Sequence, residues 1–519
     1  NNSKCLIPKI EVEISIFSAI FGNFSPHKLI IRDAVINVDI NQEKQIQPKD
    51  ESANNSEKYF LELIGFLNGL KDTYFLSRFE IANTKIVLGD KVIAINEFLV
   101  VTKYRKKTLN IEVIGEFFDK NNKITLVNGT CRLDADNELS CDGGIKDFNP
   151  KFLSRIDKNL IFFNNIDAKF DVELKTLINE SGLQDLSFMV QSKNGSFSYD
   201  GFFDKKINFE KARVDGSYDN NSKLLNLSTI DVDFSKNKNY ETKSSNPNLQ
   251  MSLVISHKND LEMLFDISLA DVSINDLDIY WPSNLAKDGI RSWLIEHGKN
   301  GFITNSNAKF SVKNDDLEKI TASLDIKGFN LSYSNNFPTI KNIEAKAQFS
   351  KNNMLIKISK ADVLESKIFN SVVRIDDFFA KDIILEIDGK SVGHGSDLLQ
   401  HVSYDSSFAE HVKKRLNGKS NNKFNIKLPL NNIDVRTLEL KVISSIKQIS
   451  NDYIVGDVEV NVDKKTMSDD FIVKFNNTNA KVHCDILGID KEKNIDSNFN
   501  FVVEVKSLEE VTIGNIIID

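Results

Sequence analysis

The chain has 519 residues, of which 41% are hydrophobic and 27% charged, and this fits a folded protein of several domains or of one extended domain. The formal net charge of −8 excludes a general nucleic-acid binder, because no basic excess is available to neutralise phosphates. No run of 18 or more apolar residues occurs, so the sequence predicts no transmembrane helix within the chain.

Segments in which apolar and polar residues alternate recur along the whole chain. The clearest is Lys423–Leu430, in which every second residue from Phe424 onward is apolar. Alternation predicts strands with one buried and one solvated face, which is typical of antiparallel pairing. The other predicted strands, in chain order, are Ala34–Ile40, Asn110–Ile114, Lys169–Leu174, Leu264–Leu269, Ala322–Ile326, Met354–Ile358, Gly456–Val462 and Asn498–Val505.

Helices are predicted at few places. The predicted helical segments are Tyr59–Lys71, Asn149–Phe163, Ser283–His297 and Ser396–Leu416. In the third of these, Ile290, Trp293, Leu294 and His297 recur at the spacing of one helix face.

Glycines indicate where the strands turn or bend. Asn194-Gly195, Asp200-Gly201 and Asp215-Gly216 are dipeptides typical of turns. Gly328 lies where the alternation slips by one residue, which predicts a β-bulge.

The four cysteines form no CxxC pair, so neither a zinc ribbon nor a redox motif is predicted. A hairpin turn near Asp136 places Cys131 opposite Cys141. These two residues can form a cross-strand disulfide in an oxidising compartment, and two thiols packed on an apolar face are the alternative.

No catalytic or metal-binding motif stands out. His394, His401 and His411 have spacings that match no metal site. Gly393-His394-Gly395-Ser396 lacks the spacing of a nucleophile elbow, and no phosphate-binding glycine loop occurs. We therefore predict no catalytic residue, no metal and no cofactor.

Both tryptophans of the chain lie in one segment. It reads Tyr280-Trp281-Pro282, then a helix with Arg291-x-Trp293, then a strand that begins near Gly301 and contains Asn307-Ala308. This order resembles the YhdP-type members of the AsmA-like family. The regions that resemble the family as well are residues 14–40, 148–166, 324–349 and 389–430.

The resemblance implies a periplasmic protein of double-membrane bacteria, held to the inner membrane by an N-terminal helix. It implies a mainly β fold, in which a long curled antiparallel sheet forms an open hydrophobic groove with a few short helices. It also implies bridge-like transfer of phospholipids between the inner and outer membranes, in support of outer-membrane lipid homeostasis. The chain begins at Asn1, and we expect the anchor to precede it.

The resemblance implies three regions along this fold. Residues 1–147 are predicted to be an N-terminal AsmA-like β region, and residues 148–430 a YhdP-type central groove with helical insertions. Residues 431–519 are predicted to continue the groove strands.

The predicted groove lining is the apolar set of each strand. Its members are Phe170, Val172, Leu174, Phe265, Ile267, Leu269, Leu324, Ile326, Ile356, Ile358, Phe424, Ile426 and Leu428. Alternation alone leaves a closed β core as the alternative, and with it a non-transporting envelope scaffold or assembly protein. An adhesin and an enzyme acting on envelope polysaccharide are further alternatives.

Overall fold

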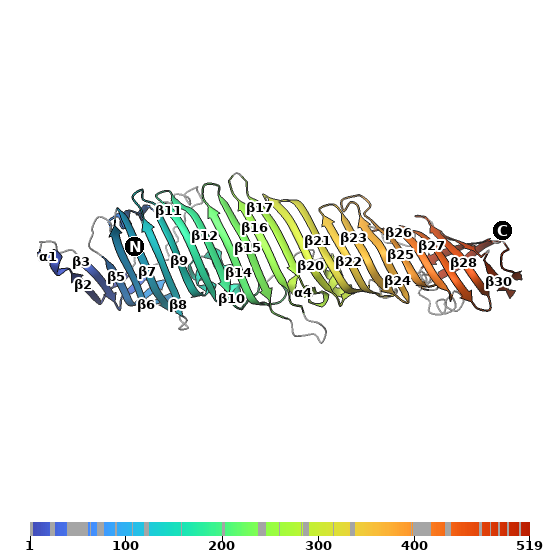
Figure 1. Ribbon diagram of the computed structural model, residues 1–519, viewed down its shortest axis with the longest axis horizontal. Helices are drawn as coiled ribbons and strands as arrows, with labels where there is room; N and C mark the ends of the chain where they lie inside the picture. Colours follow the sequence, from blue (N-terminus) through green and yellow to red (C-terminus); the bar gives the residue numbers. More distant parts are fainter. Residues whose placement is uncertain are drawn as a thin grey trace.

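The protein forms one elongated sheet (Figure 1), and every strand described in the computed structural model belongs to it. The structure describes residues 4–20, 26–38, 61–62, 64–69, 77–88, 91–105, 107–118, 124–156, 158–199, 203–236, 245–258, 260–281, 283, 290–314, 316–332, 338–395, 397, 417–430, 437–466, 470–477, 479–485, 488–495, 498–507 and 510–518. No helix within these ranges is long and apolar enough to cross a bilayer.

The strands of the first half extend from the thin end that carries α1, β2 and β3 to the middle of the molecule (Figure 1). They are β1 Lys4–Leu6, β2 Lys9–Ile14, β3 Pro26–Arg32, β4 Val35–Val38, β5 Arg78–Leu88, β6 Lys91–Arg105, β7 Thr108–Phe118, β8 Ile124–Leu133, β9 Leu139–Phe148, β10 Ile166–Ala168, β11 Phe170–Asn179, β12 Gly182–Ser192, β13 Gly195–Phe197, β14 Ile207–Asp219, β15 Leu224–Phe234, β16 Asn248–Ser256 and β17 Glu262–Ala270.

The strands of the second half continue the same sheet to its C-terminal end. They are β18 Val272–Ser273, β19 Gly298–Lys299, β20 Phe302–Lys313, β21 Asp316–Leu331, β22 Ile340–Ser350, β23 Met354–Val363, β24 Ser366–Ile375, β25 Ile384–His394, β26 Lys419–Pro429, β27 Glu439–Ser450, β28 Ile454–Lys464, β29 Asp470–Asn476, β30 Ala480–Cys484, β31 Ile489–Lys491, β32 Asn498–Ser507 and β33 Glu510–Ile518.

Helical segments are short. They are α1 Ile16–Ile20, η1 Pro150–Phe152, α3 Leu153–Ile156, η2 Lys158–Asn165, η3 Ile274–Asp276, α4 Leu277–Tyr280 and α5 Ile290–His297, together with helical turns in residues 61–62 and 64–69.

Neighbouring strands pair almost entirely antiparallel, as the alternation predicts. Two pairs differ, because β3 and β4 both pair with β5 in parallel. A long stretch of chain separates β4 from β5, which permits the crossover that a parallel pair needs. The mainly β fold class is thus confirmed, with a parallel exception near the N-terminus.

The sheet continues across both predicted region boundaries. The boundary between residues 147 and 148 lies within β9, which pairs with β11, and β26 pairs with β27 on either side of residue 430. The division into three regions remains a prediction.

Every predicted strand lies within or overlaps an observed strand. The three predicted turns have different outcomes. Asn194-Gly195 joins β12 to β13 as predicted, and Asp200-Gly201 lies outside the described residues. Asp215-Gly216 is not a turn, because both residues lie inside β14, where the register with β15 shifts. The bulge predicted at Gly328 is confirmed by a register shift and a φ of +70°.

The predicted helices are shorter than expected or broken. Asn149–Phe163 forms η1, α3 and η2 rather than one α-helix. The tryptophan segment contains α4 and α5, and α4 ends where Trp281 adopts extended backbone angles. Of the predicted helical segment Ser396–Leu416, only Asp397 lies within the described residues.

The two faces of the sheet differ sharply in polarity. One line of directly opposed residues crosses fifteen strands from β2 to β21. Its members are Val12, Leu29, Phe79, Val100, Val113, Gly129, Gly143, Leu174, Phe188, Gly216, Leu227, Leu253, Phe265, Phe310 and Ile320. All are apolar or glycine, and we call the face that carries them the apolar face.

A second line on the apolar face continues from β17 to β28. Its members are Leu269, Ser306, Leu324, Ala347, Ile356, Val373, Ile387, Ile426, Leu440 and Lys464. Its two polar members bond to backbone carbonyls: the Ser306 hydroxyl donates to the Leu269 oxygen at 2.7 Å and Lys464 Nζ to the Leu438 oxygen at 2.8 Å.

The opposite face, which we call the polar face, carries ion pairs between neighbouring strands. Lys309 pairs with Asp266 at 2.8 Å, and Arg213 bonds Asp215 along the same strand. Hydrogen bonds from these cations hold the pKa of each aspartate below its usual range. Because the pairs are exposed, they contribute little to the stability of the fold, and they keep this face in contact with water.

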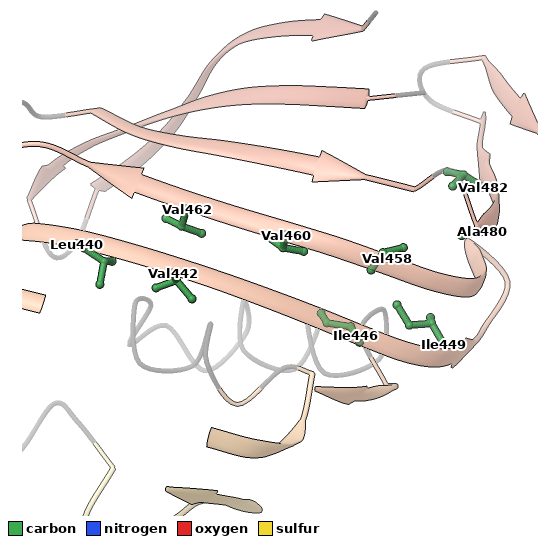
Figure 2. Close-up of a cluster of buried hydrophobic side chains, with 9 residues drawn as sticks. All are labelled: Leu440, Val442, Ile446, Ile449, Val458, Val460, Val462, Ala480 and Val482. Atoms are coloured by element: carbon green, nitrogen blue, oxygen red, sulfur yellow. The ribbon is translucent and has the colours of Figure 1, made fainter. Parts of the chain in front are cut away.

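Four buried clusters pack against parts of the apolar face. The cluster in Figure 2 lies on β27, β28 and β30, and includes Val442, Ile446 and Val458. The others centre on Ile64 and Leu67 with β7–β9, on β14 and β15, and on η3 with β21 and β22. The last two adjoin, because Leu269 and Tyr280 pack against both, so core packing is divided among three places along the sheet.

Candidate functional site

All thirteen residues predicted to line a groove lie on the apolar face. Phe170, Val172 and Leu174 lie at alternate positions of β11, and Leu174 is opposite Phe188. Phe265 is opposite Phe310 on β20, and their rings stack with centroids 4.4 Å apart. The register lines thus bring together residues that are far apart in sequence.

These thirteen residues fall into two groups. Those packed against a buried cluster are Leu269, Ile326, Ile356, Ile358, Phe424 and Ile426. Those in none of the four clusters are Phe170, Val172, Leu174, Phe265, Ile267, Leu324 and Leu428. All thirteen are partly exposed, so the second group forms apolar surface that the clusters do not cover.

Several apolar-face residues are not among the thirteen predicted ones. Val100, Phe188, Leu227, Leu253 and Phe310 lie on the same register lines as the predicted residues. Their strands alternate as well, so the signal was present in the sequence. The glycines of the line gave no such signal, because a glycine within a strand reads as a break.

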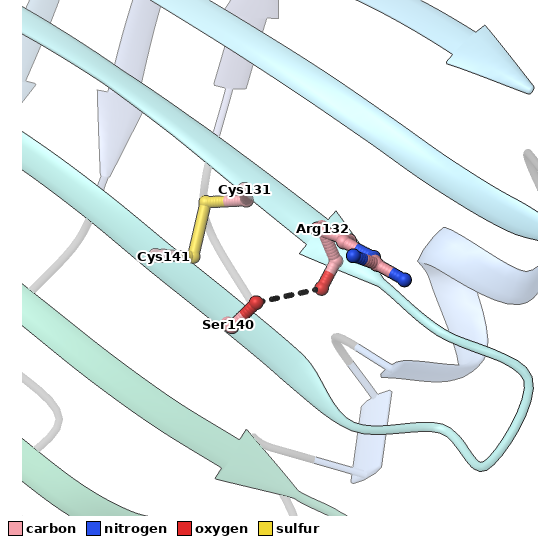
Figure 3. The surroundings of a disulfide bond; sticks show 4 residues. All are labelled: Cys131, Arg132, Ser140 and Cys141. Carbon is pink, nitrogen blue, oxygen red and sulfur yellow. Dashed lines mark hydrogen bonds between the residues drawn. A yellow bond between two sulfur atoms is a disulfide. The ribbon is translucent and has the colours of Figure 1, made fainter.

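The structure joins Cys131 and Cys141 in a disulfide (Figure 3), one of the two arrangements left open by the sequence. The two residues are directly opposite on β8 and β9, with their Cα atoms 4.1 Å apart. Both lie on the apolar face and pack against the cluster that contains Ile64 and Leu67.

Removing this disulfide should weaken the β8–β9 hairpin locally. A link across 10 residues is expected to stabilise the fold by about 3 kcal/mol, through the lost entropy of the unfolded chain. Hydrogen exchange of β8 and β9 should quicken on reduction, and the Cys131→Ala/Cys141→Ala protein should no longer respond to reductant. Equal exchange with and without reductant would contradict this expectation.

The helices η3, α4 and α5, which we call the rim helices, lie beside one edge of the sheet near β17–β22, where Figure 1 labels α4. Arg291 of α5 is buried and joins three parts of the chain. Its Nη2 donates to Asp204 at 2.8 Å and its Nε to the Trp281 carbonyl at 3.2 Å. Burial, with Asp276 nearby, raises the pKa of Tyr280 to about 12. Arg291 therefore links α5 to the end of α4 and to Asp204, while the Trp293 side chain lies outside the described residues.

A buried polar network interrupts the apolar face at β25–β27. Asn422 donates to the Ser391 and Ser420 hydroxyls at 3.0 and 3.1 Å, and the Ser444 hydroxyl donates to Asn422 at 2.6 Å. Each of these side chains is less than 5% exposed. Because its members bond to one another, the network avoids the cost of burying unpaired polar groups. The alternation beginning at Phe424 did not predict it.

Two surface concavities, of about 920 and 870 Å³, lie over β6–β15. The residues that they share include Glu112, Asp142 and Lys175, which lie on one register line of the polar face. Both concavities therefore border the solvated side of the sheet. Within the described ranges, no group of three His, Cys, Asp or Glu side chains is placed to hold a metal ion.

An elongated open sheet with one apolar face and short rim helices defines a class of extended β proteins whose sheet is not closed into a barrel. Comparison with protein families matches residues 167–512 to the family described as YhdP protein. The match covers well over half of the chain, so the chain belongs to this AsmA-like family of envelope proteins. No curated protein and no solved structure matched the chain.

Proposed function

We propose that this protein carries phospholipids along its apolar face, between the inner and outer membranes. The observation that supports this most is the fifteen-strand line without a polar side chain. Acyl chains gain roughly 25 cal/mol per Å² of apolar surface buried, so the parts of this face that the clusters leave uncovered can hold them.

The length of the face suits a bridge. The two register lines cross about twenty successive strands from β2 to β28, and strands lie about 4.8 Å apart, which gives a path on the order of 100 Å. A span of that size approaches the distance between two bilayers. The proposal includes a periplasmic location and an inner-membrane anchor outside this chain.

The mechanism needs neither a catalytic residue nor a cofactor. Lipid tails would lie against the apolar face, while head groups remain in water beside the sheet edge. Successive positions on the first line are chemically alike, so the free-energy steps between them are small. The protein acts in this proposal as a carrier and not as an enzyme.

Mass spectrometry of lipids that co-purify with the chain tests the proposal. We expect bound phospholipid, together with ultraviolet crosslinks from a photoreactive residue at Phe265. The matched control is Asp266, which is adjacent on β17 but lies on the polar face and should give no lipid crosslink. A protein free of phospholipid would overturn the proposal and leave an envelope scaffold as the alternative.

A further inference from the structure

Four glycines of the apolar face lie directly opposite a phenylalanine on the neighbouring strand. The pairs are Phe98 with Gly115, Phe188 with Gly216, Phe209 with Gly195, and Phe424 with Gly389. The pairs occur from β6 to β26, so the same arrangement recurs along most of the sheet.

In each pair the ring occupies the space above the glycine. A Cβ atom added to Gly216 would lie 2.9 Å from Phe188 Cε1, and one added to Gly115 would lie 2.8 Å from Phe98 Cδ2. None of these glycines has a positive φ, so the backbone does not require glycine at these positions. The rings require it, because any side chain there would displace them.

A phenylalanine ring that packs over a glycine lies closer to the backbone of the sheet than a ring that packs over a larger side chain. Its atoms approach the backbone to about the van der Waals separation of 3.5–4.0 Å. Gly115 and Gly216 are buried, while Phe98 and Phe188 are partly exposed and belong to none of the four clusters. These two rings therefore form low aromatic surfaces in the uncovered part of the apolar face.

We propose that the Phe98–Gly115 and Phe188–Gly216 pairs set the clearance for acyl chains on the apolar face. This inference rests on the proposed function, and it names the residues that determine how a lipid tail passes along the apolar face. Glycine allows each ring to lie close to the backbone, so a lipid tail crosses a large apolar area that contains no protruding side chain. A side chain at the glycine lifts the ring and obstructs the path, although no charge has been added and no backbone hydrogen bond has been lost.

The test is Gly216→Ala, measured by transfer of a fluorescent phosphatidylethanolamine between donor and acceptor vesicles. The added methyl group meets the ends of Phe188 and Leu227, which are mobile side-chain atoms, so the strand should remain paired. We expect the transfer rate and the co-purified phospholipid to fall several-fold, with an unchanged circular dichroism spectrum. Combining Gly216→Ala with Phe188→Leu should restore both, because leucine leaves room for the methyl group.

Gly65→Ala is the matched control, since nothing lies within 4 Å of its added methyl group. It should transfer lipid at the wild-type rate. If wild type transfers phospholipid and Gly216→Ala does so equally well, the clearance role is overturned and the proposed function stands. If wild type transfers none, the proposed function fails and this inference with it. Loss that Phe188→Leu does not restore would also overturn the clearance role.

Discussion

Leu174→Arg should abolish phospholipid carriage while the sheet remains folded. Leu174 lies opposite Phe188 in the middle of the fifteen-strand line and belongs to no buried cluster. A guanidinium in contact with acyl chains costs about 3 kcal/mol, and each 1.4 kcal/mol is tenfold, so occupancy should fall about a hundredfold. Without lipid the same side chain can reach water, so the folded state should lose about 1 kcal/mol or less.

The matched control is Glu173→Arg, one residue earlier on β11 and on the polar face. It introduces the same side chain into the same strand, where it remains solvated. Co-purified phospholipid and vesicle transfer should be lost in Leu174→Arg and retained in Glu173→Arg, with similar thermal unfolding. Normal transfer by Leu174→Arg would show that lipids do not pass over β11.

The choice of position matters, because the thirteen predicted residues are not equivalent. Ile326→Arg would place the charge against the cluster of the rim helices, where it would damage packing before it affected any lipid. A loss of function in that variant would not separate transport from folding. The residues outside the clusters do separate them.

Phe329→Ala should release the rim helices from the sheet. Phe329 is 6% exposed and packs in one cluster with Val272 and Leu277, and its ring lies against Gly298 at the end of α5. Truncating a buried phenylalanine to alanine costs about 3–5 kcal/mol, from lost burial and the cavity left behind. The loss should be confined to the rim helices and the neighbouring cluster on β14 and β15, against which Tyr280 also packs, because the other two clusters lie elsewhere along the sheet.

Hydrogen exchange resolved by segment is the appropriate measurement for this variant. Protection should fall in α5, in the C-terminal half of β21 and in β22, and remain unchanged in β7–β9, whose cluster shares no residue with that of the rim helices. Leu317→Ala is the control, since it lies on the same strand and is 41% exposed. Uniform loss of protection would show instead that the sheet unfolds as one unit.

Much of the fold could be predicted from local pattern. Alternation located the strands, and the slip at Gly328 located a bulge, because both depend on which side of a strand each residue occupies. The turn predicted at Gly216 was wrong for a reason that lies outside its own strand. Phe188 fills the space above that glycine, and the two residues are 28 positions apart.

The candidate site was predictable in composition but not in extent. The sequence identified both Leu174 and Leu269 as apolar-face residues. It could not show that clusters cover Leu269 and leave Leu174 uncovered. The buried network around Asn422 was likewise hidden, since its members come from three strands.

By itself the sequence determined the β architecture, the apolar and polar faces and the resemblance to the AsmA-like family, which the comparison confirms. These depend on the order and polarity of neighbouring residues. Only the tertiary structure decided which parts of the apolar face are covered, that Cys131 and Cys141 are bonded, and that glycines such as Gly216 lie beneath phenylalanine rings. These features depend on cross-strand register, because register determines which residues of neighbouring strands lie opposite one another. Alternation within one strand does not determine this pairing.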